Sequence, residues 1–108
     1  MKIVDSQNLN TVTSTDAPII LDLFCHPDTG MKMGMAVFPV GSRAKPTAHE
    51  QHEYCYILEG SLKVIVGNVE YIMRAGQASY IDAGDSHESI NDFDTDCRLI
   101  WVLLNGMR

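Results

Sequence analysis

The chain has 108 residues, of which 45% are hydrophobic, and its formal net charge is −6. This length fits one small domain with a packed core, so we expect a single domain over residues 1–108. Such an acidic chain is a poor partner for nucleic acid or an anionic membrane, because both are bound through clustered lysine and arginine. The sequence also has no apolar run near the roughly 20 residues of a membrane-spanning helix, and its N-terminus shows no signal-peptide core.

Short apolar segments separated by turn residues follow one another along the chain. They are rich in valine, isoleucine and aromatic residues, which is typical of strands. The segments predict strands at 18–25, 33–40, 53–60, 62–67, 69–73, 78–82 and 98–104. Gly67 and Asn68 separate two of these segments by two residues, a spacing that favours a tight hairpin. Only the stretch 6–16 could hold a helical turn, so we expect an all-β sandwich or small barrel.

The three cysteines lie far apart in the sequence. Cys25, Cys55 and Cys97 form no C-x-x-C pair, and their number is odd. This pattern argues against a disulfide framework and against a cysteine-rich zinc site. We therefore expect reduced thiols, which act as small buried apolar residues, in a cytoplasmic protein.

Histidine and glutamate crowd the stretch TAHEQHEYCYILEG, residues 47–60. His49 and Glu53 would share a face of an extended chain but lie roughly 13 Å apart, so joint metal binding requires a bend between them. After Gly84 we expect a short strand that begins near His87. Because a barrel brings distant strands side by side, His49, Glu53 and His87 could converge. Two imidazoles and one carboxylate leave open coordination positions and suit Fe(II), Mn(II), Ni(II) or Zn(II).

The residues around this stretch resemble the two motifs of the cupin family. The first motif, G-x5-H-x-H-x3-E-x6-G, aligns with Gly41, Thr47, His49, Glu53 and Gly60. The second motif, G-x5-P-x-G-x2-H-x3-N, aligns with Gly76, Asp82, Gly84, His87 and Asn91. All spacings match, and eight of the ten positions carry the family residue. The chain thus resembles a small single-domain cupin of the RmlC-like superfamily, of the conserved-barrel type, whose fold is a double-stranded β-helix or jelly-roll barrel.

The resemblance also implies a metal site. Cupins commonly bind a divalent metal through three histidines and a glutamate, and the matching positions here are His49, Glu53 and His87. Thr47 stands where the family usually has another histidine, and a neutral hydroxyl is a poor ligand beside imidazole. His52 lies in the region that must bend, so it is a further possible ligand, although in a regular strand it would point away from Glu53. An alternative is an empty polar pocket whose residues hydrogen-bond to one another or to an organic acid.

The expected function follows from this site and leaves several possibilities. The first is a metal-dependent enzyme, such as an isomerase, lyase or dioxygenase, that acts on a small polar substrate such as a sugar acid or another carboxylate. His52, Tyr54 and Tyr80 are candidate catalytic residues, because a nearby histidine or tyrosine could carry protons. The second is a binding or sensor module without an essential metal, since residues 49–68 are similar to the sensor cupins of helix-turn-helix regulators. The third is a barrel whose pocket has lost its function.

Pairing between two copies of the chain is the expected assembly. Small barrels expose apolar edges and faces, and a two-fold axis covers them. Strand alternation places Cys55 on the inner face with Glu53 and turns Tyr54 and Tyr56 outward, towards a partner sheet or subunit. We therefore expect a homodimer that binds a small-molecule ligand.

Overall fold

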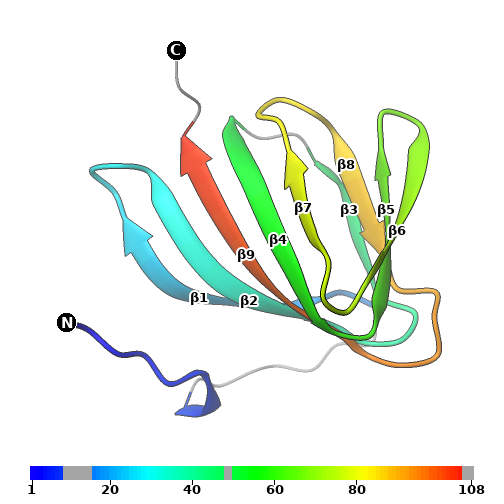
Figure 1. Cartoon of the computed structure of the whole chain (residues 1–108), viewed down its shortest axis with the longest axis horizontal. Helices are drawn as coiled ribbons and strands as arrows, with labels where there is room; N and C mark the ends of the chain where they lie inside the picture. The colour runs from blue at the N-terminus through cyan, green and yellow to red at the C-terminus, as the bar shows by residue number, and fades with distance from the viewer. Residues whose placement is uncertain (9–15, 48–49, 106–108) are drawn as a thin grey trace.

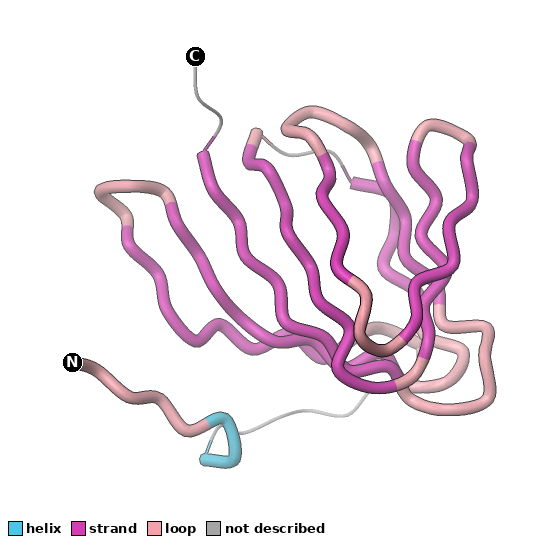
Figure 2. Tube along the Cα trace, viewed as in Figure 1, coloured by secondary structure: helices cyan, strands magenta, loops and turns pink. Residues whose placement is uncertain are grey.

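The computed structural model describes residues 1–8, 16–47 and 50–105, which fold into two antiparallel sheets that face each other (Figure 1). One sheet has the strand order β1-β2-β9-β4-β7 and the other has the order β3-β8-β5-β6. The elements are a short 3-10 helix at Ser6–Asn8 and the strands β1 Ile19–His26, β2 Met31–Phe38, β3 Arg43–Thr47, β4 Gln51–Glu59, β5 Ser61–Val66, β6 Val69–Arg74, β7 Ala78–Ile81, β8 His87–Ile90 and β9 Cys97–Asn105. This arrangement is the expected jelly-roll barrel, and strands dominate its described part (Figure 2). No helix in that part is long and apolar enough to cross a membrane.

The predicted strands are present, with ends that differ by up to two residues, and the short strand after Gly84 is β8. The tight hairpin is also confirmed, because Val66 pairs with Val69 across Gly67 and Asn68. Both turn residues have positive φ, 56° and 67°, as a type I′ turn requires. Strand β3 was not predicted, because its residues RAKPT have no alternating apolar pattern. Proline is tolerated there because β3 lies at the edge of its sheet.

The hydrophobic core lies between the sheets and is concentrated at one end of the barrel. Its members are less than a tenth exposed: Ala36, Phe38, Ile57, Leu62, Val64, Met73, Ile81, Cys97, Leu99 and Trp101. Most of these residues come from the end of β2, the end of β4 and the beginnings of β5 and β9. At this end the sheets come together, whereas the other ends of the same strands spread apart (Figure 1). We call these the closed end and the open end of the barrel.

Asn91 holds the closed end together. Its side chain is fully buried, and its Nδ2 donates to the carbonyl oxygens of Phe38 and Thr95 at 2.8 Å each. Its Oδ1 accepts from the N–H of Phe93 at 3.0 Å. The backbone N–H of Asn91 donates to the carbonyl of Ser42 at 3.0 Å. One residue therefore connects the β2–β3 and β8–β9 segments, and its polar atoms are satisfied despite burial.

Candidate functional site

Glu53 and His87 meet inside the barrel from opposite sheets. Glu53 lies near the start of β4, His87 is the first residue of β8, and both strands begin at the open end. Nε2 of His87 lies 3.2 Å from Oε2 of Glu53. His87 is 9% exposed, because the two sheets cover its ring. The structure thus brings together two of the three residues that the sequence suggested as metal ligands.

The hydrogen bonds of His87 favour its protonated form. Nδ1 lies 3.4 Å from the carbonyl oxygen of Asp85, which can only accept, so Nδ1 carries the hydrogen in this contact. When Nε2 also donates to Glu53, the ring is an imidazolium. The hydrogen bond to Glu53 accordingly raises the pKa of His87 above its ordinary value, against the opposing effect of burial. A ring held at Nδ1 presents Nε2 towards the cavity in a fixed orientation.

A cavity of about 440 Å³ lies between the sheets next to this pair. Glu53 and His87 line it together with apolar core residues such as Phe38, Leu62 and Trp101. Cys55 faces the cavity as strand alternation predicted, and burial raises the pKa of its thiol to about 12. This thiol therefore stays protonated near neutral pH and is neither a ready nucleophile nor a ready metal ligand.

His52 lies on the opposite side of β4 from Glu53 and does not line the cavity. Its Nδ1 accepts from the N–H of Ala83 at 3.1 Å and lies 2.7 Å from the hydroxyl oxygen of Tyr80. The Tyr80 hydroxyl donates to Asp82 at 2.6 Å, and this hydrogen bond raises the pKa of Tyr80 to about 12. Tyr54 stacks beside Tyr80, with ring centroids 5.0 Å apart. The three candidate catalytic residues therefore form an outer cluster that is separate from Glu53 and His87.

Comparison with known proteins identifies the family. The family model described as a cupin domain matches residues 34–103, which include Glu53, His87 and the cavity's main strands. The chain is a cupin. None of the curated proteins compared matches it significantly.

Solved cupin structures share the fold at low sequence identity. A predicted oxalate decarboxylase from Thermotoga maritima has a TM-score of 0.85 at 20% identity and covers 97% of this chain and 100% of its own. KdgF from Halomonas sp. has a TM-score of 0.82 at 13% identity, with 98% and 96% covered. The Cupin_2 domain of an XRE family transcriptional regulator from Enterobacter cloacae has a TM-score of 0.76 at 10% identity, with 85% and 100% covered. These similarities establish the fold and leave the activity of this cupin open.

A further motif position of this cupin, Thr47, lies beside the start of β8. The backbone of Thr47, which stands where the family usually has a metal histidine, pairs directly with His87 in the β3–β8 register. His49 lies outside the described residues. Among the residues that are described, no group of three or more histidine, cysteine, aspartate and glutamate side chains could hold a metal ion. The described part of the site therefore consists of Glu53 and His87.

The separation of these two donors fits a shared metal ion. Ligand atoms about 2.1 Å from an ion, at angles of 90–110°, lie about 3.0–3.4 Å apart. The 3.2 Å between Nε2 of His87 and Oε2 of Glu53 falls within that range. The same distance also suits a direct hydrogen bond between the two groups. Nitrogen and oxygen donors of this kind suit the first-row divalent metals.

Two lysines that the sequence analysis did not single out also line the cavity, namely Lys32 and Lys45. Lys32 lies on the same face of β2 as Gly34 and Ala36, which are buried. Its inward position could therefore have been predicted from the strand pattern. Nζ of Lys32 lies 4.0 Å from Asp22, another lining residue. The cavity thus combines an apolar interior with charged groups of both signs.

Proposed function

We propose that this cupin binds a divalent iron, manganese, nickel or zinc ion through His49, Glu53 and His87. We further propose that it acts as a metal-dependent enzyme on a small polar substrate, such as a sugar acid or another carboxylate. The observation that supports the proposal is the 3.2 Å approach of Glu53 to His87 beside a 440 Å³ cavity. Cavities of roughly 300–1,000 Å³ with a few polar groups are typical of small-molecule sites.

The residues around the cavity suggest how a substrate would be held. Lys32 and Lys45 provide positive charge that attracts a carboxylate. Phe38, Leu62 and Trp101 form apolar walls that exclude water from the polar pair. The carbonyl of Asp85 fixes the ring of His87 through Nδ1. A bound ion would supply Lewis-acid polarisation of a substrate oxygen or activation of O2.

The second candidate is a binding or sensor module without an essential metal. The position of His52, Tyr54 and Tyr80 favours this alternative, because these candidate proton carriers lie outside the cavity. The fold similarity to the cupin domain of an XRE family regulator is compatible with it. In such a module the protonated His87 and the two lysines would bind an organic anion directly.

Metal content separates the two candidates. We expect near-stoichiometric metal, measured by plasma mass spectrometry, in protein purified without added ions. Replacement of His49 or His87 by alanine, or Glu53→Gln, should remove most of this metal. His26→Ala is a matched control, because His26 is exposed at the end of β1 and does not line the cavity, so the metal content should stay unchanged.

The contrary results are equally specific. If the wild-type protein takes up none of the four metals when each is supplied in excess, the enzyme proposal is wrong and the binding module is favoured. If metal is bound but all three site variants retain it, the ion lies elsewhere. A pocket that has lost its function would show neither metal nor carboxylate binding, and His49→Ala would change nothing.

We also propose that the chain forms a homodimer through the outer face of its five-stranded sheet and that it works in the cytoplasm. Tyr54, Tyr56, Leu58, Tyr80 and Leu104 are each more than a third exposed. Exposed apolar surface of this extent is typical of an interaction site. The three cysteines are unpaired, which agrees with a reducing compartment.

A further inference from the structure

The junction of β6 and β7 brings the free edges of the two sheets together. Among the described strands, β6 pairs with β5 alone and β7 pairs with β4 alone. Tyr71 and Met73 lie on the same face of β6, yet Met73 is 7% exposed and Tyr71 is 53% exposed. The edge strands β6 and β7 therefore lie close together near Met73 and are separated near Tyr71.

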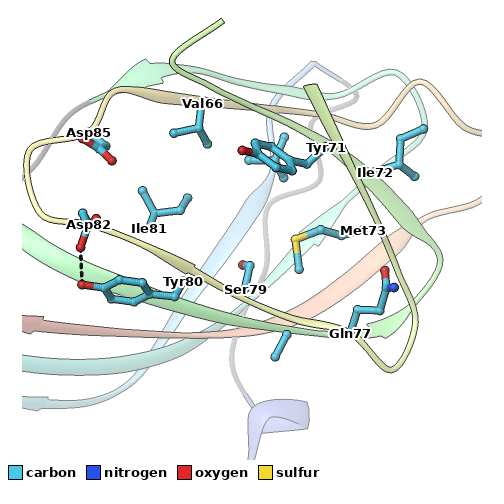
Figure 3. Close-up of a pocket in the computed structure, with 12 residues that line it drawn as sticks. Val66, Tyr71, Ile72, Met73, Gln77, Ser79, Tyr80, Ile81, Asp82 and Asp85 are labelled. Atoms are coloured by element: carbon cyan, nitrogen blue, oxygen red, sulfur yellow. Dashed lines mark hydrogen bonds between the residues drawn. The ribbon is translucent and has the colours of Figure 1, made fainter. Parts of the chain in front are cut away.

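The space where they part is a second cavity of about 620 Å³, which we call the seam pocket (Figure 3). Val66, Tyr71, Met73 and Ile81 provide apolar walls, and neither Glu53 nor His87 lines it. In Figure 3, Asp82 and Asp85 lie together at one end, and Gln77 lies at the other. The seam pocket thus has an apolar body and an acidic end.

The charge at the acidic end is not balanced within the seam pocket. None of the described residues that line it is lysine, arginine or histidine. Tyr80 donates a hydrogen bond to Asp82 but carries no charge itself. His52 stands behind Tyr80, with Nδ1 4.0 Å from Asp82, and would add positive charge only when protonated. Two carboxylates beside an aromatic wall attract a cation, because the faces of tyrosine rings also favour positive charge.

We propose that the seam pocket binds small organic ammonium ions. The apolar part of the ligand packs against Val66, Tyr71 and Met73, and its charged nitrogen lies at Asp82 and Asp85. The 620 Å³ volume holds a ligand the size of an arylalkylamine. Binding needs no metal and no contact with Glu53 or His87. The seam-pocket proposal is therefore independent of the proposed enzyme activity.

The test is a titration of ¹⁵N-labelled protein with 2-phenylethylammonium chloride at pH 7.5, above the usual titration range of histidine. We expect saturable amide shifts at Tyr71, Ile72 and Asp85 that exceed those at Glu53 and Trp101. The uncharged analogue 3-phenylpropan-1-ol should bind more weakly. Asp85→Asn should weaken ammonium binding about threefold, the effect of one partly exposed ion pair.

Two further variants make the result specific. Asp94→Asn removes the same charge from an exposed loop at the other end of the barrel, so it should leave the affinity unchanged (Figure 1). Tyr71→Thr keeps a strand-forming residue but removes an apolar wall, and should also weaken binding. The spectra themselves report whether each variant is folded. Equal binding of ammonium and alcohol, equal effects of Asp85→Asn and Asp94→Asn, or shifts centred on Glu53 would each overturn the proposal.

Discussion

At the scale of single residues, the contact between Glu53 and His87 would have two chemical states if the proposed metal ion binds. Without an ion, Glu53 stabilises the protonated ring and raises the pKa of His87. With an ion, the proton on Nε2 must leave, because a metal binds the neutral imidazole. Proton and metal would therefore compete for the same nitrogen, and metal affinity should fall as the pH is lowered.

The pKa of His87 can be tested in metal-free protein. We expect His87, followed by NMR in the presence of EDTA, to titrate above 6.5, and we expect Glu53→Gln to lower its pKa. Because the folded-state pKa is raised, the contact stabilises the protein fully below pH 6.5, and this contribution disappears as the pH rises through the folded-state value. The unfolding free energy of the variant should depend less on pH in that window. An unchanged His87 titration in Glu53→Gln would show that Glu53 is not the cause.

Side-chain direction was predictable where strand alternation applies. Cys55 faces inward while Tyr54 and Tyr56 are each 44% exposed, as the alternation along β4 predicted. The same rule places His52 away from Glu53. The approach of Glu53 to His87 was suggested by the expected barrel, which brings distant strands side by side, and by the cupin motifs, since no local pattern reports on contacts between residues so far apart in the sequence. The hydrogen bond from the N–H of Ala83 to His52 and the contact of His52 with the Tyr80 hydroxyl were not predicted, because they depend on a loop conformation.

At the scale of strands, Gly34 allows three neighbouring strands to pack closely. It lies on β2, which pairs with β1 on one side and β9 on the other. A Cβ atom at this position would overlap with the carbonyl oxygen of Leu21 and with the indole ring of Trp101. The indole ring of Trp101 therefore lies against Gly34, and Trp101 forms part of the cavity wall.

Gly34→Ala should destabilise the protein by about 1–3 kcal/mol, as overpacking typically does. Urea unfolding measures this loss. Trp101 is the single tryptophan of the chain, so its fluorescence emission should also change in the folded variant. Gly41→Ala is the control, because Gly41 has φ of +85° but no atom near the added Cβ. It should cost about 1–2 kcal/mol of backbone strain without changing the emission; an emission change in both variants would refute the packing explanation.

The strands differ in how well the sequence predicts them. Valine, isoleucine and aromatic residues mark β1, β2, β4, β5, β6, β7 and β9, since these strands contribute to the core or to the large outer face. Strand β3 carries Arg43, Lys45 and Pro46, and it is held by pairing with β8 at an irregular register. Its position depends on a partner distant in sequence, so local propensity could not identify it.

At the scale of the whole molecule, the sequence did not predict how far the sheets spread at the open end or what covers the outer sheet face. Apolar residues on a strand predict burial, but they do not say whether the core, a ligand or a second subunit covers them. Tyr71 illustrates the difficulty, because it lies on the inner face of β6 and is still half exposed. The extent to which two sheets diverge is set by their twist and by all their loops together.

The outer face of the five-stranded sheet should mediate dimerisation. We expect the protein to sediment as a dimer at micromolar concentration and Tyr56→Glu to shift it to monomer, because a charge would be buried in the centre of the apolar face. Ile72→Glu is the matched control, since Ile72 is 51% exposed on the other sheet and should leave the dimer intact. A monomeric wild type, or a dimer insensitive to Tyr56→Glu, would contradict this interface.

The hydrogen bonds of Asn91 at the closed end have a consequence for how this barrel can evolve. They fix one pole of the molecule, while Glu53, His87 and the acidic end of the seam pocket lie nearer the opposite pole. Substitutions near the open end should therefore change the shape of the cavities with little loss of folding stability. A short chain with one anchored end can therefore acquire new chemistry through mutations at the other end.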